Sequence, residues 1–171
     1  GKKFIDISLM GVGTNILGYG NEEIDNEVRK TIKKGNISTL NCPEEVYLSE
    51  KLIKIHPWSS MVKLTRTGGE ANAVAIRIAR AACGKDKVAV CGYHGWHDWY
   101  IAANLKNSKN LDQHLLSGVN TLGVPKNLKN SVLTFRYNNI LDLEKIVHQN
   151  GPFEEALAVT KFPEFYLFLY Q

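Results

Sequence analysis

The residues best suited to chemistry lie in the run Thr65-Arg66-Thr67-Gly68-Gly69-Glu70-Ala71, between an expected strand and an expected helix. The first turn of a helix carries unpaired backbone N–H groups, and the helix dipole adds partial positive charge there. Gly68 and Gly69 would let the backbone approach an anion closely. Thr67 offers a hydroxyl donor and Arg66 a nearby cation. The spacing fits a phosphate site and also fits a plain turn that binds nothing. It is not a Walker loop, because no Gly-Lys-Ser/Thr follows.

A second candidate is the run Gly92-Tyr93-His94-Gly95-Trp96-His97-Asp98-Trp99-Tyr100, directly after another expected strand. Open α/β sheets bind ligands at the carboxyl ends of parallel strands, where an aromatic ring could cover a flat cofactor. His94, His97 and Asp98 could also be metal ligands. Three ligands so close together in sequence seldom form a closed site, so we expect no metal. The tryptophans are also explained by packing at an interface or by anchoring of the loop.

These two runs belong to one strand–turn–helix–strand unit over residues 61–91, the βαβ pattern of a parallel sheet. The expected strands are residues 61–65 and 87–90, and the expected helix spans residues 70–83 with Gly84 as its C-cap. Apolar residues recur in this helix at the spacing of one helical face. They are Ala71, Val74, Ala75, Ile78, Ala79 and Ala82.

Weaker patterns predict the rest of the chain. The expected elements are a strand at 4–9, a helix at 22–34 capped by Asn21, a helix from Pro43 to 55, a loop at 106–130, a strand at 132–135, a helix at 141–149 and a strand at 156–160. In the second of these helices, Leu48, Leu52 and Ile55 are expected to face inward. Strands that alternate with helices indicate an α/β fold.

The composition argues against several classes of protein. A chain of 171 residues with 44% hydrophobic and 22% charged residues suits one globular domain. The net charge of +4 comes from scattered basic residues, so we expect no nucleic-acid partner. No apolar run approaches the length of a membrane helix, so we expect no membrane partner. The three cysteines form no CxxC pair, which favours free thiols in a reducing cytoplasm.

Several motifs, taken in order, resemble the class III family of pyridoxal-phosphate-dependent aminotransferases. The run Thr67-Gly68-Gly69-Glu70-Ala71-Asn72 is similar to the family's glycine turn, and Tyr93-His94-Gly95 is similar to its aromatic-His-Gly after a strand. The likeness covers roughly residues 2–160 and looks greatest to members of the glutamate-1-semialdehyde 2,1-aminomutase type and to sugar-linked aminotransferases. Four further segments resemble the family in order and spacing: Phe4-Ile5-Asp6, Leu17-Gly18-Tyr19-Gly20-Asn21, Glu50-Lys51-Leu52 and Arg77-Ile78-Ala79-Arg80.

The resemblance implies part of the large domain of a fold-type I transferase, with a mostly parallel sheet and flanking helices. In the family the glycine turn holds the phosphate of pyridoxal 5'-phosphate, a role that passes here to Thr67, Gly68 and Gly69. The family's aromatic residue, which stacks on the pyridine ring, corresponds to Tyr93. His94 follows it and is expected near the ring.

Two positions depart from the family pattern. Gly69 stands where the family usually has Ser or Thr, which removes a hydroxyl donor to the phosphate. Arg66 stands where the family often has a small polar residue, and it could compensate for the lost hydroxyl or disturb the turn. Glu70, an acid in the first helical turn, is expected to be structural.

The implied activity moves an amino group on an amino and keto, or aldehyde, substrate. Small-molecule amino donors and acceptors, a homodimer and a cytoplasmic location follow from the same resemblance. The family's catalytic lysine comes after the matched segments, so we expect an incomplete chain with no catalytic residue assigned, inactive and poorly soluble alone. We expect N-terminal elements at 1–57, part of the large domain at 58–160 and an atypical tail at 161–171. The alternatives are an inert truncated or degenerate chain without cofactor, and a phosphate-binding module for another ligand.

Overall fold

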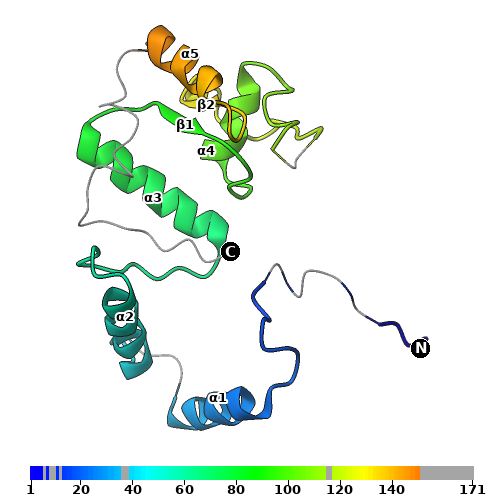
Figure 1. Ribbon diagram of the computed structural model, residues 1–171, viewed down its shortest axis with the longest axis vertical. Helices are drawn as coiled ribbons and strands as arrows, with labels where there is room; N and C mark the ends of the chain where they lie inside the picture. Colours follow the sequence, from blue (N-terminus) through cyan, green and yellow to red (C-terminus); the bar gives the residue numbers. More distant parts are fainter. Residues whose placement is uncertain (6, 8–10, 12, 36–38, 115–116, 151–171) are drawn as a thin grey trace. The chain divides into compact units, whose positions relative to one another are not determined.

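The computed structural model describes residues 1–5, 7, 11, 13–35, 39–114 and 117–150. Three helices precede the first short strand in this part of the chain, and further helices lie between and after the two strands (Figure 1). In chain order they are α1 (Glu22–Lys34), α2 (Pro43–Ile55), α3 (Gly68–Cys83), β1 (Val88–Val90), α4 (Asp98–Ile101), the 3-10 helices η1 (Ala102–Leu105) and η2 (Lys126–Leu128), β2 (Val132–Thr134) and α5 (Ile140–Asn150).

The described residues form two compact units, one ending at Ile55 and the other beginning at His56. The first unit holds α1 and α2, the two helices expected there. Asn21 caps α1, since its side-chain oxygen accepts a hydrogen bond of 3.1 Å from the N–H of Ile24. Neither helix buries a residue, and Leu48 and Ile55 are exposed. The inward orientation expected of Leu48 and Ile55 is therefore wrong, while Leu52 is half-buried; helical periodicity defines an apolar face but not what covers it.

The second unit contains a two-stranded parallel sheet, in which Val88 pairs with Val132 and Val90 with Thr134. The expected strands at 87–90 and 132–135 are confirmed, and their parallel pairing agrees with the mostly parallel sheet expected. Residues 61–65 are not a strand: only Met61 forms an isolated bridge. Residues 4, 5 and 7 are also outside any strand. Extended residues form a strand only when a neighbour completes the hydrogen-bond ladder, which sequence patterns do not report. The strand expected at 156–160 lies outside the described residues.

The core of the second unit joins α3, the sheet and α4 with the chain that follows. Tyr100 and Leu111 are completely buried. In the described part of the expected loop at 106–130 the only helix is the short η2, but this part packs closely. The N–H of Leu111 donates to Asn104 Oδ1 at 3.0 Å, and Asn104 Nδ2 donates to the Val119 carbonyl. The main buried cluster is Ile76, Val88, Val90, Trp99, Tyr100, Ala103, Leu111 and Val132. This core fixes the carboxyl end of β1 beside the start of α3.

Among the residues that the structure describes, none of the helices is both long and apolar enough to cross a membrane.

Candidate functional site

A reciprocal capping box starts helix α3. Thr67 is the N-cap: its hydroxyl oxygen accepts from the N–H of Glu70 at 3.2 Å. The Glu70 carboxylate in turn accepts from the N–H groups of Thr67 at 3.3 Å and Arg66 at 2.9 Å. The structural role expected for Glu70 is therefore confirmed. The helix begins at Gly68, two residues before the expected start at 70, because this box supports the first turn and offsets the low helix propensity of glycine.

The same turn leaves donors for a ligand. Within the described part of the chain, the N–H groups of Gly68 and Gly69 make no hydrogen bond. The Thr67 hydroxyl uses an oxygen lone pair for the cap and keeps its proton to donate. These donors lie at the positive end of a sixteen-residue helix. The arrangement fits a phosphate group.

A second segment, residues 91–97 after β1, lies against this turn. The Asn72 side-chain amide donates to the carbonyl of His94 at 3.1 Å. Gly95 has a φ of +99°, and a Cβ on it would lie 2.7 Å from the Cα of Gly69. Two backbones approach this closely only where side chains are absent. The two runs singled out in the sequence are therefore brought together at the start of α3.

Tyr93 and His94 differ in how freely they could meet a ligand. Tyr93 is 38% exposed, and its ring stands edge-on to that of Tyr100, with ring centroids 6.2 Å apart. His94 Nε2 donates to the Cys91 carbonyl at 2.7 Å, which leaves Nδ1 as its remaining polar ring atom. Tyr93 is thus placed to cover a flat ring, whereas His94 also holds its own loop together.

Tyr100 supports the segment 91–97 through a hydrogen bond. Its hydroxyl donates to the Gly92 carbonyl at 2.9 Å. Burial, and after it the neighbouring Tyr93, raises the pKa of Tyr100 to about 12. The two nearby tryptophans differ in burial. Trp99 is buried in the core, as an anchor of the loop would be, while Trp96 is 72% exposed.

Two residues of this site carry roles that the sequence reasoning missed. Asn72 is buried on the apolar face of α3, and a polar residue at such a position was a signal that it bonds to something. His97, considered only as a metal ligand, lies with its ring beside Gly69. Within the described ranges, no three His, Cys, Asp or Glu side chains form a group that could hold a metal ion.

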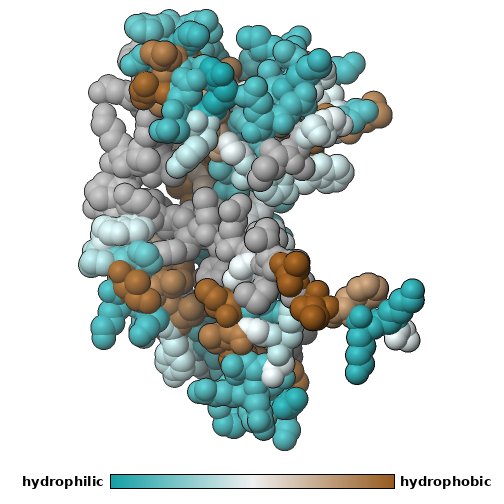
Figure 2. Space-filling view, turned by 45° about the vertical axis from the view of Figure 1, so that its right-hand side comes forward, coloured by the Kyte–Doolittle hydropathy of each residue, from teal (hydrophilic) through white to brown (hydrophobic). Residues whose placement is uncertain are grey.

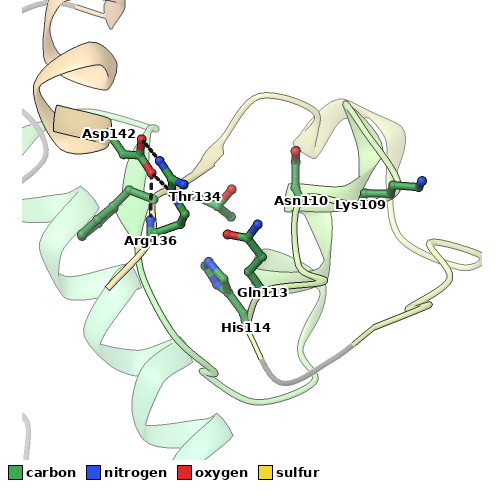
Figure 3. A pocket seen from close by; sticks show the side chains of 8 residues that line it. Lys109, Asn110, Gln113, His114, Thr134, Arg136 and Asp142 are labelled. Atoms are coloured by element: carbon green, nitrogen blue, oxygen red, sulfur yellow. Dashed lines mark hydrogen bonds and ion pairs between the residues drawn. The ribbon is translucent and has the colours of Figure 1, made fainter. Parts of the chain in front are cut away.

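A polar cavity of about 290 Å³ lies at the carboxyl end of β2 (Figure 3). Arg136 and Asp142 form an ion pair at its edge, which holds the pKa of the Asp142 carboxyl below its usual range. His114 is buried in its wall, and this burial lowers the pKa of the imidazole. The lining residues are Lys109, Asn110, Gln113, His114, Thr134, Phe135, Arg136 and Asp142. In Figure 3, Gln113 and His114 extend toward Thr134 and Arg136.

Comparison with known proteins relates the site to one enzyme family. The chain is 35% identical over 161 residues to the 3-aminobutyryl-CoA aminotransferase of Cloacimonas acidaminovorans (strain Evry), a match that covers 94% of this chain and 34% of that relative. It is 33% identical over 159 residues to the glutamate-1-semialdehyde 2,1-aminomutase of Methanothrix thermoacetophila, covering 88% and 34% respectively. No family model matches the chain.

A solved structure shares the fold. An omega-transaminase from Sphaerobacter thermophilus superposes with a TM-score of 0.70 at 24% identity, over 88% of this chain and 34% of that one. The expected α/β fold of a fold-type I transferase is therefore confirmed. The chain spans about a third of the length of the curated relatives it matches. By these similarities, this chain belongs to the class III family of pyridoxal-phosphate-dependent aminotransferases and aminomutases.

Proposed function

We propose that this chain is the phosphate-binding and ring-covering part of a pyridoxal-phosphate enzyme that moves an amino group. Thr67, Gly68 and Gly69 hold the phosphate, Tyr93 covers the pyridine ring and His94 lies next to it. One observation carries the proposal: unused backbone donors at the start of α3 lie against the aromatic segment 93–97. This occurs in a chain similar to an aminotransferase over 94% of its length.

The residues of the turn act by binding and orienting. Three groups donate charge-assisted hydrogen bonds to the phosphate oxygens: the N–H groups of Gly68 and Gly69 and the hydroxyl of Thr67. The capping box keeps these donors in place before the ligand arrives, which lowers the entropic cost of binding. The Tyr93 ring, supported edge-on by Tyr100, covers one face of the ring and excludes water from it. Bound pyridoxal phosphate supplies the electron-withdrawing ring through which amino groups are transferred.

The substrates in this proposal are small amino donors and keto or aldehyde acceptors, by either an aminotransferase or an aminomutase reaction. The working protein is a homodimer in the cytoplasm. Free and partly buried cysteines, Cys42, Cys83 and Cys91, support a reducing compartment.

Nuclear magnetic resonance titration of the isotope-labelled chain tests the assignment. The probe is pyridoxine 5'-phosphate, which has no aldehyde to react with surface lysines. We expect its addition to shift the amide signals of residues 67–70 and 93–95 most. Pyridoxine without phosphate should shift the turn far less. Shifts centred elsewhere, or none at millimolar probe, would show that the turn is not the cofactor site. Equal responses to inorganic phosphate and to pyridoxine phosphate, confined to 67–70, would indicate a phosphate-binding module.

Substitution of Gly68 by Val gives an independent check. A branched side chain at the first helical position should block the approach of the phosphate, so affinity for pyridoxine 5'-phosphate should fall at least about tenfold. Ala81→Val is the matched control, because Ala81 is exposed near the other end of α3. Equal affinities of the two variants, measured by calorimetry, would count against the phosphate assignment.

A further inference from the structure

The space next to Gly69 is occupied by the ring of His97. A Cβ built on Gly69 would lie 2.8 Å from His97 Cε1 and 2.9 Å from His97 Nδ1. Both distances are shorter than real Cβ atoms show, so a side chain on residue 69 and the imidazole in its present place exclude one another. The imidazole therefore fills the volume that any larger residue at position 69 would need.

The backbone of His97 is firmly placed, while its ring is unused. His97 is the N-cap residue of α4, and its carbonyl accepts from the N–H groups of Tyr100 at 2.9 Å and Ile101 at 3.1 Å. Both of those residues are buried, which anchors the position. Its side chain makes no capping hydrogen bond, and its ring makes none to the described residues. His97 is exposed, so its ring lies beside the glycine turn with its nitrogens open to solvent and to a ligand.

The ring occupies the position that a side chain on residue 69 would take, next to the N–H of Gly69. The Nδ1 atom of His97 lies 2.9 Å from the position of a Cβ on Gly69, the second residue of α3. It is therefore close to the Cα of Gly69, whose N–H makes no hydrogen bond to the described residues. A hydroxyl on residue 69 would occupy nearly the same region. An imidazole N–H donates to phosphate oxygens whether the ring is neutral or protonated, and more strongly when protonated.

We propose that His97 is a phosphate ligand at this turn, where its imidazole takes the place of a hydroxyl side chain on residue 69. This inference rests on the proposed function, because it names an additional residue of the same phosphate site. Positions 69 and 97 then form one unit: glycine at 69 makes room for the ring, and the ring restores the donor that glycine lacks.

A double-mutant cycle tests the pairing. The measured quantity is the ratio of the dissociation constants for pyridoxine and pyridoxine 5'-phosphate, which isolates the contribution of the phosphate. His97→Ala should lower this ratio about tenfold, the scale of one charge-assisted hydrogen bond. Gly69→Ser alone should leave the ratio nearly unchanged, because the new side chain displaces the ring while its hydroxyl supplies a donor in the same place. The double variant Gly69→Ser/His97→Ala should recover most of the loss, because the serine hydroxyl enters the vacated space.

A second readout needs no variant. The ring ¹⁵N signals of His97 in the unchanged chain should shift when inorganic phosphate is added and stay constant when chloride is added at equal ionic strength. His97→Gln, whose side chain keeps an N–H donor, should retain more of the ratio than His97→Ala. The His97→Gln variant can replace His97→Ala in the comparison if the alanine variant is poorly folded.

The outcomes separate the two proposals. If phosphate shifts the amide signals of residues 68 and 69 but leaves the His97 ring unchanged, and His97→Ala keeps the ratio, the phosphate site stands and the role of His97 is wrong. If the double variant loses as much as His97→Ala alone, the idea that a hydroxyl on residue 69 and the His97 ring replace one another is wrong. If phosphate shifts neither the turn nor the ring, the proposed function fails and this inference fails with it.

Discussion

At the residue scale, Tyr93 and Trp96 are two aromatic side chains in one short segment with different surroundings. Tyr93 stands against the buried ring of Tyr100, whereas Trp96 is largely exposed. A ring that is held at its edge can present its face to a ligand with little loss of side-chain entropy. This difference makes Trp96 a natural control for the role of Tyr93.

Replacement of Tyr93 by Ala should weaken binding of pyridoxine 5'-phosphate by about 1 kcal/mol, roughly fivefold, because the aromatic pair with the pyridine ring is lost. Trp96→Ala should leave the affinity nearly unchanged. Calorimetric titration of both variants provides the measurement. A larger loss of affinity for Trp96→Ala than for Tyr93→Ala would show that Tyr93 is not the residue that stacks on the ring.

His114 makes the stability of the fold depend on pH. Burial lowers the pKa of its imidazole and nearby His94 adds to this effect, while the backbone carbonyls of Gly92 and Phe135, which accept from the ring, oppose it. The unfolded chain therefore takes up this proton near the ordinary value of about 6.5, before the folded chain does. The stabilisation is complete above that pH, and it is lost as the pH falls toward the lower pKa of the folded state.

His114→Gln should remove this dependence. Between about pH 7 and about pH 5, the free energy of unfolding should fall less in the variant than in the unchanged chain. His148→Gln is the control, since His148 is exposed in the last turn of α5. Urea denaturation at the two pH values gives the comparison. Parallel losses in the chain and in both variants would exclude His114 as the source.

At the element scale, the N-terminus of α3 serves both the fold and the site. The Thr67 hydroxyl accepts the cap hydrogen bond from Glu70, and the donors left over point to the proposed phosphate. Stability and binding at this turn therefore draw on different atoms of the same residues. A substitution that keeps the hydroxyl should preserve both.

Thr67→Ala should destabilise the second unit by about 1 kcal/mol through loss of the N-cap, while Thr67→Ser should cost much less. Urea denaturation followed by circular dichroism measures both variants without any ligand. Equal stability of the two variants would mean that the cap hydrogen bond contributes nothing measurable.

The elements that sequence patterns predicted are those defined by local chemistry. Asn21 before three acids predicted the start of α1, and the apolar spacing in α3 with Gly84 after it predicted that helix to its last residue. The strand at 61–65 was wrong because a strand depends on a partner distant in sequence. The predicted site residues Gly69 and Tyr93 do lie in neighbouring segments, but the contact between Gly69 and His97 is a matter of tertiary geometry. No spacing rule encodes which ring will occupy the space beside a glycine.

At the scale of the whole molecule, the two compact units differ in how much they bury. The second unit has a continuous core around Tyr100 and Leu111, whereas α1 and α2 bury no residue. Large apolar side chains of the first unit stay at the surface, among them Ile24, Val28 and Ile32 on α1. Figure 2 shows such hydrophobic patches on the face that it presents. An isolated helix of this length is marginal in water without tertiary packing.

The rate of amide hydrogen exchange should therefore differ between the two units. Amides in α3, β1 and β2 should exchange slowly, and those in α1 should exchange much faster. The measurement should be made at two protein concentrations, because association through the exposed apolar residues would protect α1 only at the higher one. Slow exchange of α1 and α3 alike in a dilute sample would contradict this division.

The contact between Gly95 and Gly69 also limits how this segment can evolve. Gly95 has a left-handed φ, and a Cβ on it would lie 2.7 Å from a backbone atom, which has no rotamer by which to move aside. A lineage can exchange residues 69 and 97 together, because one side chain makes room for the other. Position 95 has no such compensating partner. Every substitution of this glycine should therefore give a less stable protein, so we expect neighbouring positions to diverge while position 95 remains glycine.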